Sequence, residues 1–456
     1  MKRLKQFAVV YCAVLLGAAG IAMAVGIDAP SGVDNLSADP ASVSDAQHVA
    51  DQEVFEEHDG IAEGLGPVFN MRSCVDCHQQ PVTGGISQVF ELRAGTIANN
   101  VFTPASLTIN FFGAGGTVTI ANRSLINQEA ICPAVIKDAA GVTTFNFPNT
   151  DMHERISNGA INADIRAIRA ATNILGDGFV EVIADSTLLG ITATQRATPA
   201  NLVGTPNHPS SFFGVNQSAG ENTVVDLLER PGFTRVGRFG WKSQLASLVS
   251  FSGGAYLNEM GITNRIAPVD VTDLCDTTPD PEDGDDDVTI FARFMRMTKP
   301  QSPDANWAGL PDSISGSALF DQIGCAFCHT RNITTAPMGT VFPGVDNSTT
   351  PGVNLVVSAG MGSKTIHPFS DFALHNVHPD NIGDTQANGQ PIPFNKTRTA
   401  PLWGVRFRNQ MMHDGIAESF TEAILSHGGE ANFANLNFQA LSTTNKNRLL
   451  SFLRSL

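Results

Sequence analysis

One short motif, present twice, constrains this chain more than any other feature. It reads CVDCH at residues 74–78 and CAFCH at residues 325–329. Two thiols at this spacing can reach both vinyl groups of one porphyrin, and the C-x-x-C-H pattern is the attachment signature of c-type haem. The histidine that follows can bind the iron as an axial ligand. The sequence therefore predicts two covalently bound haems, held by Cys74, Cys77, His78, Cys325, Cys328 and His329.

Two other readings of paired cysteines explain the motif less well. A single C-x-x-C can be a thioredoxin-like redox pair, and two pairs can form one four-cysteine zinc site. Neither arrangement accounts for the histidine that follows both pairs. A zinc ribbon would also bring its two pairs much closer together in the sequence.

The N-terminal residues predict an exported protein. Residues 1–24 resemble a secretory signal peptide, with Lys2, Arg3 and Lys5 before an apolar run and an A-x-A-type cleavage site at residues 22–24. A permanent membrane anchor is the alternative, but the apolar run is short for a span. Export to the periplasm suits the motifs, because c-type haem is attached outside the bacterial cytoplasm.

The remaining chain, at 456 residues in total, is long enough for two or three domains. We expect a flexible leader, two haem domains and a connecting linker. The boundaries are 25–45 for the leader, 46–298 for the N-terminal cytochrome c-like haem domain, 299–311 for the linker and 312–456 for the C-terminal cytochrome c-like haem domain.

Local patterns predict a mainly α fold, with a partly β insert in the first domain. Helices are expected at residues 47–57, 161–171, 288–297 and 315–323, and from Thr443 onward. Residues 88–148 contain alternating apolar positions with frequent Gly and Asn, which favours short strands or hairpins.

The net charge, the remaining cysteines and an acidic run limit which partners and additional cofactors we expect. The net charge of −16 argues against binding to nucleic acids or anionic membranes, and would suit a basic electron-transfer partner. Cys132 and Cys275 are the mature cysteines outside the motifs, and they either pair in the oxidising periplasm or stay as buried thiols. The acidic run at 276–287 is either a solvated loop or a calcium site without EF-hand spacing.

Several further stretches give the chain a family resemblance. It resembles the di-haem oxidoreductase (putative peroxidase) family, which is related to bacterial di-haem cytochrome c peroxidases. The matching stretches are residues 65–78, 84–85, 237–242, 260–263, 324–329, 400–404, 413–415 and 422–431.

The resemblance implies a sixth ligand for the C-terminal haem. Relatives place that ligand fourteen residues beyond the His of H-D-G, which is His413 here, so the expected ligand is His427. Bis-His ligation gives a lower potential than Met ligation. His427 could instead cap a helix, and the other candidate ligands are Met411, Met412, His375 and His378.

The resemblance also implies an open N-terminal haem that reacts with hydrogen peroxide. Glu181 is the candidate proton-transfer carboxylate, unless it is structurally paired or solvated. Trp241 is the candidate bridge between the haems, with Trp403 as the alternative. His153 and His208 are available as distal groups but unsupported.

These features together predict a periplasmic peroxidase-type oxidoreductase. Its C-terminal haem would relay electrons from a donor protein, such as a small cytochrome or a copper protein. The alternatives are a pure di-haem electron-transfer cytochrome, and an oxygenase or protein-modifying enzyme that uses the same open haem.

Overall fold

The structure is a computed structural model, and it describes most of the chain. The described residues are 27–36, 43–111, 117–120, 123–131, 134–137, 143–146, 163–198, 219–272, 276, 278–385 and 391–456. The predicted signal peptide, Cys132, Cys275, His153 and His208 lie outside these ranges. Within them, no helix combines the length and the apolar character that a membrane span requires.

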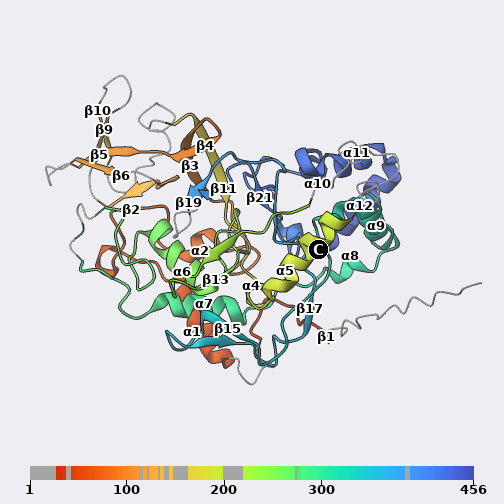
Figure 1. Cartoon of the computed structure of the whole chain (residues 1–456), viewed down its shortest axis with the longest axis horizontal. Helices are drawn as coiled ribbons and strands as arrows, with labels where there is room; N and C mark the ends of the chain where they lie inside the picture. The colour runs from red at the N-terminus through yellow and green to blue at the C-terminus, as the bar shows by residue number, and fades with distance from the viewer. Residues whose placement is uncertain are drawn as a thin grey trace, which may run out of the picture.

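The helices gather in two places (Figure 1). The helices that follow the second motif lie together with the one that precedes it, and those around the first motif lie at the opposite end of the molecule. The helices are α1 Asp45–Glu56, α2 Cys74–Cys77, α4 Asp177–Glu181, α5 Asp185–Ala197, α6 Leu248–Ala255, α7 Asp287–Met297, α8 Ala305–Ala308, α9 Pro311–Gln322, α10 Phe420–Leu425, α11 Asn432–Ala440 and α12 Thr443–Ser455. Short 3₁₀ turns are η1 Ile61–Glu63, η5 Cys325–Phe327, η6 Val405–Phe407 and η7 Gly429–Ala431, and η4 Tyr256–Met260 is a π-helix.

The strands are short and form several small sheets. They are β1 Ile27–Asp28, β2 Val68–Phe69, β3 Phe90–Ala98, β4 Val101–Pro104, β5 Leu107–Phe111, β6 Thr117–Ile120, β7 Leu125–Ile126, β8 Glu129–Ala130, β9 Ala134–Lys137, β10 Thr143–Asn146, β11 Ile165–Ala170, β12 Val224–Asp226, β13 Thr234–Val236, β14 Ile333–Thr334, β15 Val341–Asp346, β16 Asn354–Val356, β17 Lys364–Ile366, β18 Leu374–His375, β19 Asp384–Thr385, β20 Pro391–Ile392 and β21 Thr397–Arg398. The larger sheets have the orders β10-β9-β5-β6, β11-β3-β4 with β7 on β3, and β1-β17-β14. Two-stranded pairs are β2-β8, β12-β13, β15-β16, β18-β21 and β19-β20.

The predicted fold class, mainly α with two cytochrome c-like domains, is wrong. Helices make up 33% of the structure and strands 18%, and the strands are spread over several sheets. Strands β14–β21 all follow the second motif, where the sequence analysis placed an α domain. Their short segments are interrupted by Gly and Pro, which end regular structure, and each strand pairs with a segment that is distant in the sequence or joined by an irregular loop.

Individual elements divide between confirmed and incorrect predictions. The strands expected in 88–148 are confirmed, as are the helices seen as α1, α7, α9 and α12. The helix expected at 161–171 is wrong, because β11 pairs antiparallel with β3 over six residues, from Ile165↔Gly95 to Ala170↔Phe90. The cross-strand hydrogen bonds and contacts override the weak helical pattern of this segment.

Residues from both sides of the predicted linker share the largest hydrophobic core. From before residue 299 come Phe55, Phe69, Val180, Ile262 and Phe291, and from after residue 311 come Phe342, Val345, Leu355 and Ile366. A second core joins α9 to α12 through Phe320, Leu449, Phe452 and Leu453. Each such side chain stabilises the folded state by roughly 1.5–3 kcal/mol when it is fully buried. Both cores therefore hold the motif next to them in place.

Candidate functional site

The second motif begins directly after helix α9. Pro311 stands at the first position of this helix, where a missing N–H costs nothing. Gly324 then turns the chain with φ of +100°, and a Cβ there would lie 2.3 Å from the Phe433 ring. Only glycine fits both constraints, so the turn delivers Cys325 to the start of η5 and His329 just beyond it.

His329 and His427 face each other across this site. Their ring centroids are 6.3 Å apart, with 50° between the ring planes. Nδ1 of His329 lies 2.8 Å from the Phe369 carbonyl oxygen, and Nδ1 of His427 lies 2.6 Å from that of Ala423. A ring that donates from Nδ1 leaves Nε2 as the free acceptor. Both imidazoles are therefore fixed in the tautomer that binds a metal through Nε2.

The separation and the protonation state of the two rings fit one iron between them. Two imidazoles bonded at ~2.0–2.1 Å on opposite sides of a metal have centroids roughly 6 Å apart. Burial, followed by the charge of His427, lowers the pKa of His329 to about 4. Burial also lowers the pKa of His427. Both rings are neutral at pH 7, as metal binding requires.

A large cavity surrounds these two histidines. The space between its walls is about 1340 Å³, with the open solvent at its mouth included. The wall is mostly apolar, and Cys325 and Cys328 both line it. The other apolar lining residues include Phe320, Leu402, Val405, Phe420, Leu449 and Leu453. Thiols, axial imidazoles and apolar walls match a covalently held porphyrin.

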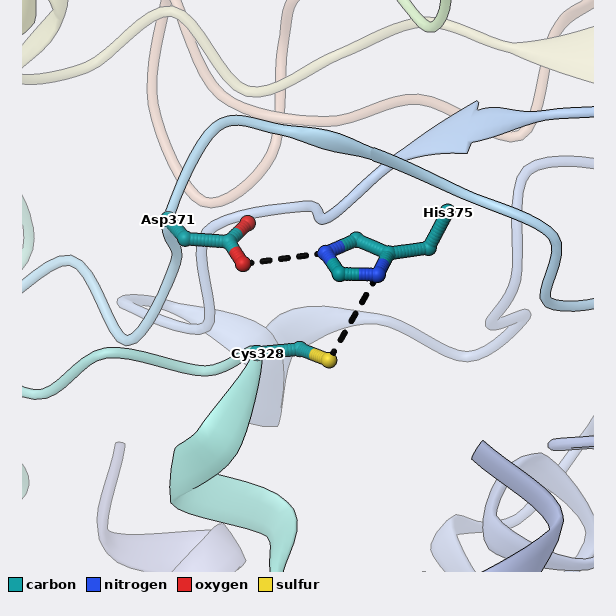
Figure 2. A group of neighbouring side chains, drawn as sticks. All are labelled: Cys328, Asp371 and His375. Carbon is teal, nitrogen blue, oxygen red and sulfur yellow. Dashed lines mark hydrogen bonds and ion pairs between the residues drawn. The ribbon is translucent and has the colours of Figure 1, made fainter. Parts of the chain in front are cut away.

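The other proposed ligands of this haem have different partners. Nε2 of His375 is 3.0 Å from Asp371 and its Nδ1 is 2.9 Å from Glu430. Figure 2 shows that His375 lies between Asp371 and the sulfur of Cys328, which is 3.8 Å from Nδ1. Carboxylates therefore occupy both nitrogens of this ring. His378 likewise contacts Asp414 at 2.8 Å, whereas Met411 and Met412 line the cavity.

The first motif is held by backbone contacts. Ser73 caps α2 by accepting a hydrogen bond from the Val75 N–H at 3.3 Å. Nδ1 of His78 is 3.3 Å from the Gly85 carbonyl oxygen, and the Phe55 ring lies 6.2 Å from the imidazole, centroid to centroid. Burial lowers the pKa of His78 to about 4. This ring too is neutral at pH 7, and its Nδ1 is held by the Gly85 carbonyl oxygen.

The two motif histidines differ in what faces them. His427 faces His329. Among the residues that the structure describes, Phe55 is the aromatic ring in contact with His78, and no second imidazole meets it. The environments of the two histidines are therefore unequal over the described part of the chain.

Glu181 is fully buried in an ion pair. Arg296 contacts both of its oxygens, with Nε to Oε2 at 2.6 Å and Nη2 to Oε1 at 2.9 Å. The Leu248 N–H also donates to Oε1, at 2.7 Å. Both oxygens of its carboxylate therefore accept hydrogen bonds from these groups. This geometry favours a structurally paired carboxylate, which was the alternative to a proton-transfer group.

Trp241 borders the second motif and is hydrogen-bonded to the segment that leads toward the first. Its ring lines the cavity of the second motif, and its Nε1 donates to the Ala170 carbonyl oxygen at 2.7 Å. Two residues beyond Ala170, the backbone of Thr172 hydrogen-bonds to His78. One indole thus connects the second cavity to the strand end that contacts the first motif. Trp403 is buried in the main core, where its Nε1 has no hydrogen-bond partner.

Comparison with known proteins assigns the family. Residues 144–456 match the family model described as "Di-haem oxidoreductase, putative peroxidase". The chain belongs to this family. The matched residues include the second motif, whereas the first motif precedes them. The predicted family is confirmed, and membership makes this chain a haem-binding oxidoreductase.

The comparisons with curated proteins and with solved structures do not narrow the assignment beyond the family. No curated protein matches the chain. Among solved structures, it is similar to Kuenenia stuttgartiensis hydrazine synthase pressurised with xenon, at 13% identity and a TM-score of 0.26. That match covers 46% of this chain and 62% of the other, so this di-haem oxidoreductase spans less than two thirds of the similar structure.

A buried ion network fixes Trp241 in this family member. Asp380 binds Arg169 at 2.6 Å and Lys242 at 2.8 Å, and all three side chains are almost inaccessible to solvent. Burial alone would raise the pKa of Asp380, but the charges of Arg169 and Lys242 lower it overall. Because Lys242 follows Trp241 and Arg169 precedes its Ala170 partner, the network clamps the indole from both sides.

Sequence reasoning missed a carboxylate beside the first motif. Glu259 lies in the π-helix η4, and its charge acts on Cys77. Burial, and then the charge of Glu91, raise the pKa of Glu259 to about 7. Its Oε2 accepts a hydrogen bond from the Asn70 side chain. Little in the sequence indicated this residue. π-Helices are frequent at functional sites, but the sequence pattern does not show where they form.

Three carboxylates of the acidic run meet a fourth, that of Asp270. One oxygen each of Asp270, Asp276, Asp280 and Glu282 lies within 4.8 Å of the others. Burial, and then the charges of its acidic neighbours, raise the pKa of Asp270 to about 8. Calcium binding at this run stays a prediction.

Proposed function

We propose that this family member is an exported c-type di-haem oxidoreductase of the peroxidase type. Cys74, Cys77 and His78 would hold one haem, and the second motif would hold the other. The observation that carries the proposal is the pairing of His329 with His427, set against His78, which no second imidazole contacts among the described residues.

The two sites then have different tasks. Bound haem supplies one-electron chemistry where both axial positions are filled, and reaction with a small oxidant where one position is free. His329 and His427 would fill both positions at the second site. His78 would hold one position at the first site, where hydrogen peroxide is the proposed oxidant.

Backbone carbonyl groups orient the histidines of both sites, and one tryptophan is the proposed route for electrons between them. The carbonyl oxygens of Phe369, Ala423 and Gly85 hold the three imidazoles in the metal-binding tautomer. Trp241 lines the second cavity and donates a hydrogen bond to the Ala170 carbonyl oxygen, and these contacts support its proposed role as the bridge for electrons.

Proton transfer needs a carboxyl group that holds a proton near neutral pH. Glu181 is committed to Arg296. Glu259, with a pKa of about 7 beside Cys77, is better suited. In this proposal Glu259 stores and releases a proton beside the first motif, and Glu181 stabilises the fold.

The electron donor and the location follow from the sequence. The acidic charge would steer a basic small cytochrome or copper protein toward the surface. The signal-like residues 1–24 support a periplasmic location.

An EPR spectrum of the purified ferric protein, with and without hydrogen peroxide, tests the proposal. We expect one low-spin bis-His signal that peroxide leaves unchanged and one high-spin signal that peroxide alters. Two low-spin signals indifferent to peroxide would instead identify a pure electron carrier. Donor-dependent consumption of peroxide then separates a peroxidase from an oxygenase or protein-modifying enzyme.

A further inference from the structure

Two arginines line the cavity of the second motif without an anionic contact. Arg398 lies in β21 and Arg408 just beyond η6, and both side chains border the cavity that contains His329 and His427. Most other arginines of the described chain form ion pairs, such as Arg169 with Asp380 and Arg296 with Glu181. Within the described ranges, neither Arg398 nor Arg408 has a carboxylate within salt-bridge distance.

The hydrogen bonds of these two guanidinium groups are also incomplete. Nε of Arg398 donates to the Gly240 carbonyl oxygen at 2.7 Å, and no acceptor among the described residues meets its two terminal nitrogens. The Arg408 side chain forms no hydrogen bond to any residue that the structure describes. A guanidinium has five N–H donors in a planar fork that matches carboxylate geometry. The cavity therefore receives several unused donors.

These arginines face the internal space rather than the outer surface. Arg398 is only 7% exposed. Burial, and then the positive charge of Arg398, lower the pKa of Arg408 to about 10, so the two cations are close neighbours. Arg408 is half-buried. The charges of Asp177 and Asp371, which form no ion pair with Arg398, only partly offset its charge. An anion bound in the cavity would stabilise both cations.

The fixed anions expected in this cavity belong to the porphyrin itself, which has two carboxylate side chains. We propose that Arg398 and Arg408 form a carboxylate-binding site for the second haem, and that their charge raises its reduction potential. This inference rests on the proposed function, because it requires a haem on Cys325 and Cys328. The physical reason for the effect is that reduction adds an electron, which nearby cations stabilise.

The test measures the midpoint potential of the low-spin haem by spectroelectrochemistry, together with its Soret circular dichroism. The variants are Arg408→Gln, Arg408→Lys and Arg398→Gln. Arg448, an exposed arginine on α12 paired with Asp312, gives the matched control Arg448→Gln. We expect a shift to more negative potential in both cavity glutamine variants, with altered Soret dichroism, and wild-type values for Arg448→Gln.

Arg408→Lys keeps the charge but loses the planar fork, so we expect a smaller negative shift. This variant serves if Arg408→Gln does not fold. The proposal would be overturned if Arg408→Lys, and every glutamine variant that folds, had the same midpoint potential and Soret dichroism as the wild type. A shift in Arg408→Lys as large as in Arg408→Gln would also overturn it, because the effect would not follow charge.

Mass spectrometry of the peptide that contains Cys325 and Cys328 separates this failure from failure of the proposed function. A peptide without haem would disprove covalent attachment at the second motif. If the peptide carries haem but the midpoint potential does not change in either arginine variant, only the carboxylate-binding site is disproved.

Discussion

His329 and His427 face each other at 6.3 Å between ring centroids, and each has its Nδ1 bound to a backbone carbonyl oxygen. The two residues come from opposite sides of the cavity and are almost a hundred positions apart in the sequence. Each ring is oriented before any metal binds, because the anchoring partners are backbone atoms of the surrounding fold. This relationship gives the second site its proposed role in electron relay.

Replacing His427 by Ala should open one face of the second iron. We expect the low-spin EPR signal to be replaced by a high-spin one, with haem still attached through the motif cysteines. His427→Met should instead stay low-spin and shift the midpoint potential upward, because Met ligation raises it. His378→Ala is the control, since its ring is bound to Asp414. A low-spin spectrum in His427→Ala would contradict the assignment.

Replacing Trp241 by Ala should slow electron transfer between the two haems. We expect a decrease of about tenfold or more, equivalent to ~1.4 kcal/mol or more in the barrier, measured by stopped-flow absorbance after reduction of the second haem. Trp403→Phe is the matched control, because Trp403 packs in the core. Equal rates in the wild type and in Trp241→Ala, with both haems present, would exclude the bridge.

Replacing Glu181 by Gln should destabilise the fold. Arg296 would remain buried without its counter-charge, and removal of one partner of a buried pair costs roughly 3–5 kcal/mol. Denaturant unfolding measures this loss. If Glu181 acts in proton transfer instead, the variant should unfold like the wild type and lose turnover.

Glu259 should make stability depend on pH. Its pKa is raised in the folded state from 4.5 to about 7, so between these values the folded protein binds more protons than the unfolded chain. The stabilisation is complete below pH 4.5 and is lost as pH rises toward 7. Glu259→Gln lacks this ionisation, so its free energy of unfolding should fall less over this range. Parallel curves for variant and wild type would contradict the raised pKa.

The same group should affect catalysis differently from stability. If Glu259 stores the proton used with peroxide, Glu259→Gln should lower kcat and remove a pH dependence centred near 7, while the haem content stays unchanged. Glu259→Asp should restore part of the activity, because it keeps a carboxyl group. A normal pH profile in Glu259→Gln would assign proton transfer to another residue.

Prediction from sequence succeeded for features set by nearby residues. The helix that precedes the second motif and the terminal helix depend on residues within a few turns of one another, and α9 and α12 formed as expected. The His427 prediction used a spacing of fourteen residues inside one stretch of chain, and the structure brings that ring to His329.

Prediction failed where strand pairing decided the structure. β11 has a local sequence compatible with a helix, but its partner β3 lies about seventy residues earlier and supplies the hydrogen bonds. The small sheets after the second motif have the same origin. No local pattern records which distant segment provides the second strand.

The amino-acid sequence alone was enough to predict two haem-attachment motifs and to recognise the family, because those signals are contiguous and chemically specific. Only the tertiary structure decided which charged side chains are paired within the fold and which remain free to interact with a bound group. Glu181 is occupied by Arg296 from 115 residues away, whereas Arg408 is left facing a cavity. Pairing and burial of charges depend on contacts across the fold, and burial sets their energy, so only the folded chain distinguishes a structural charge from a functional one.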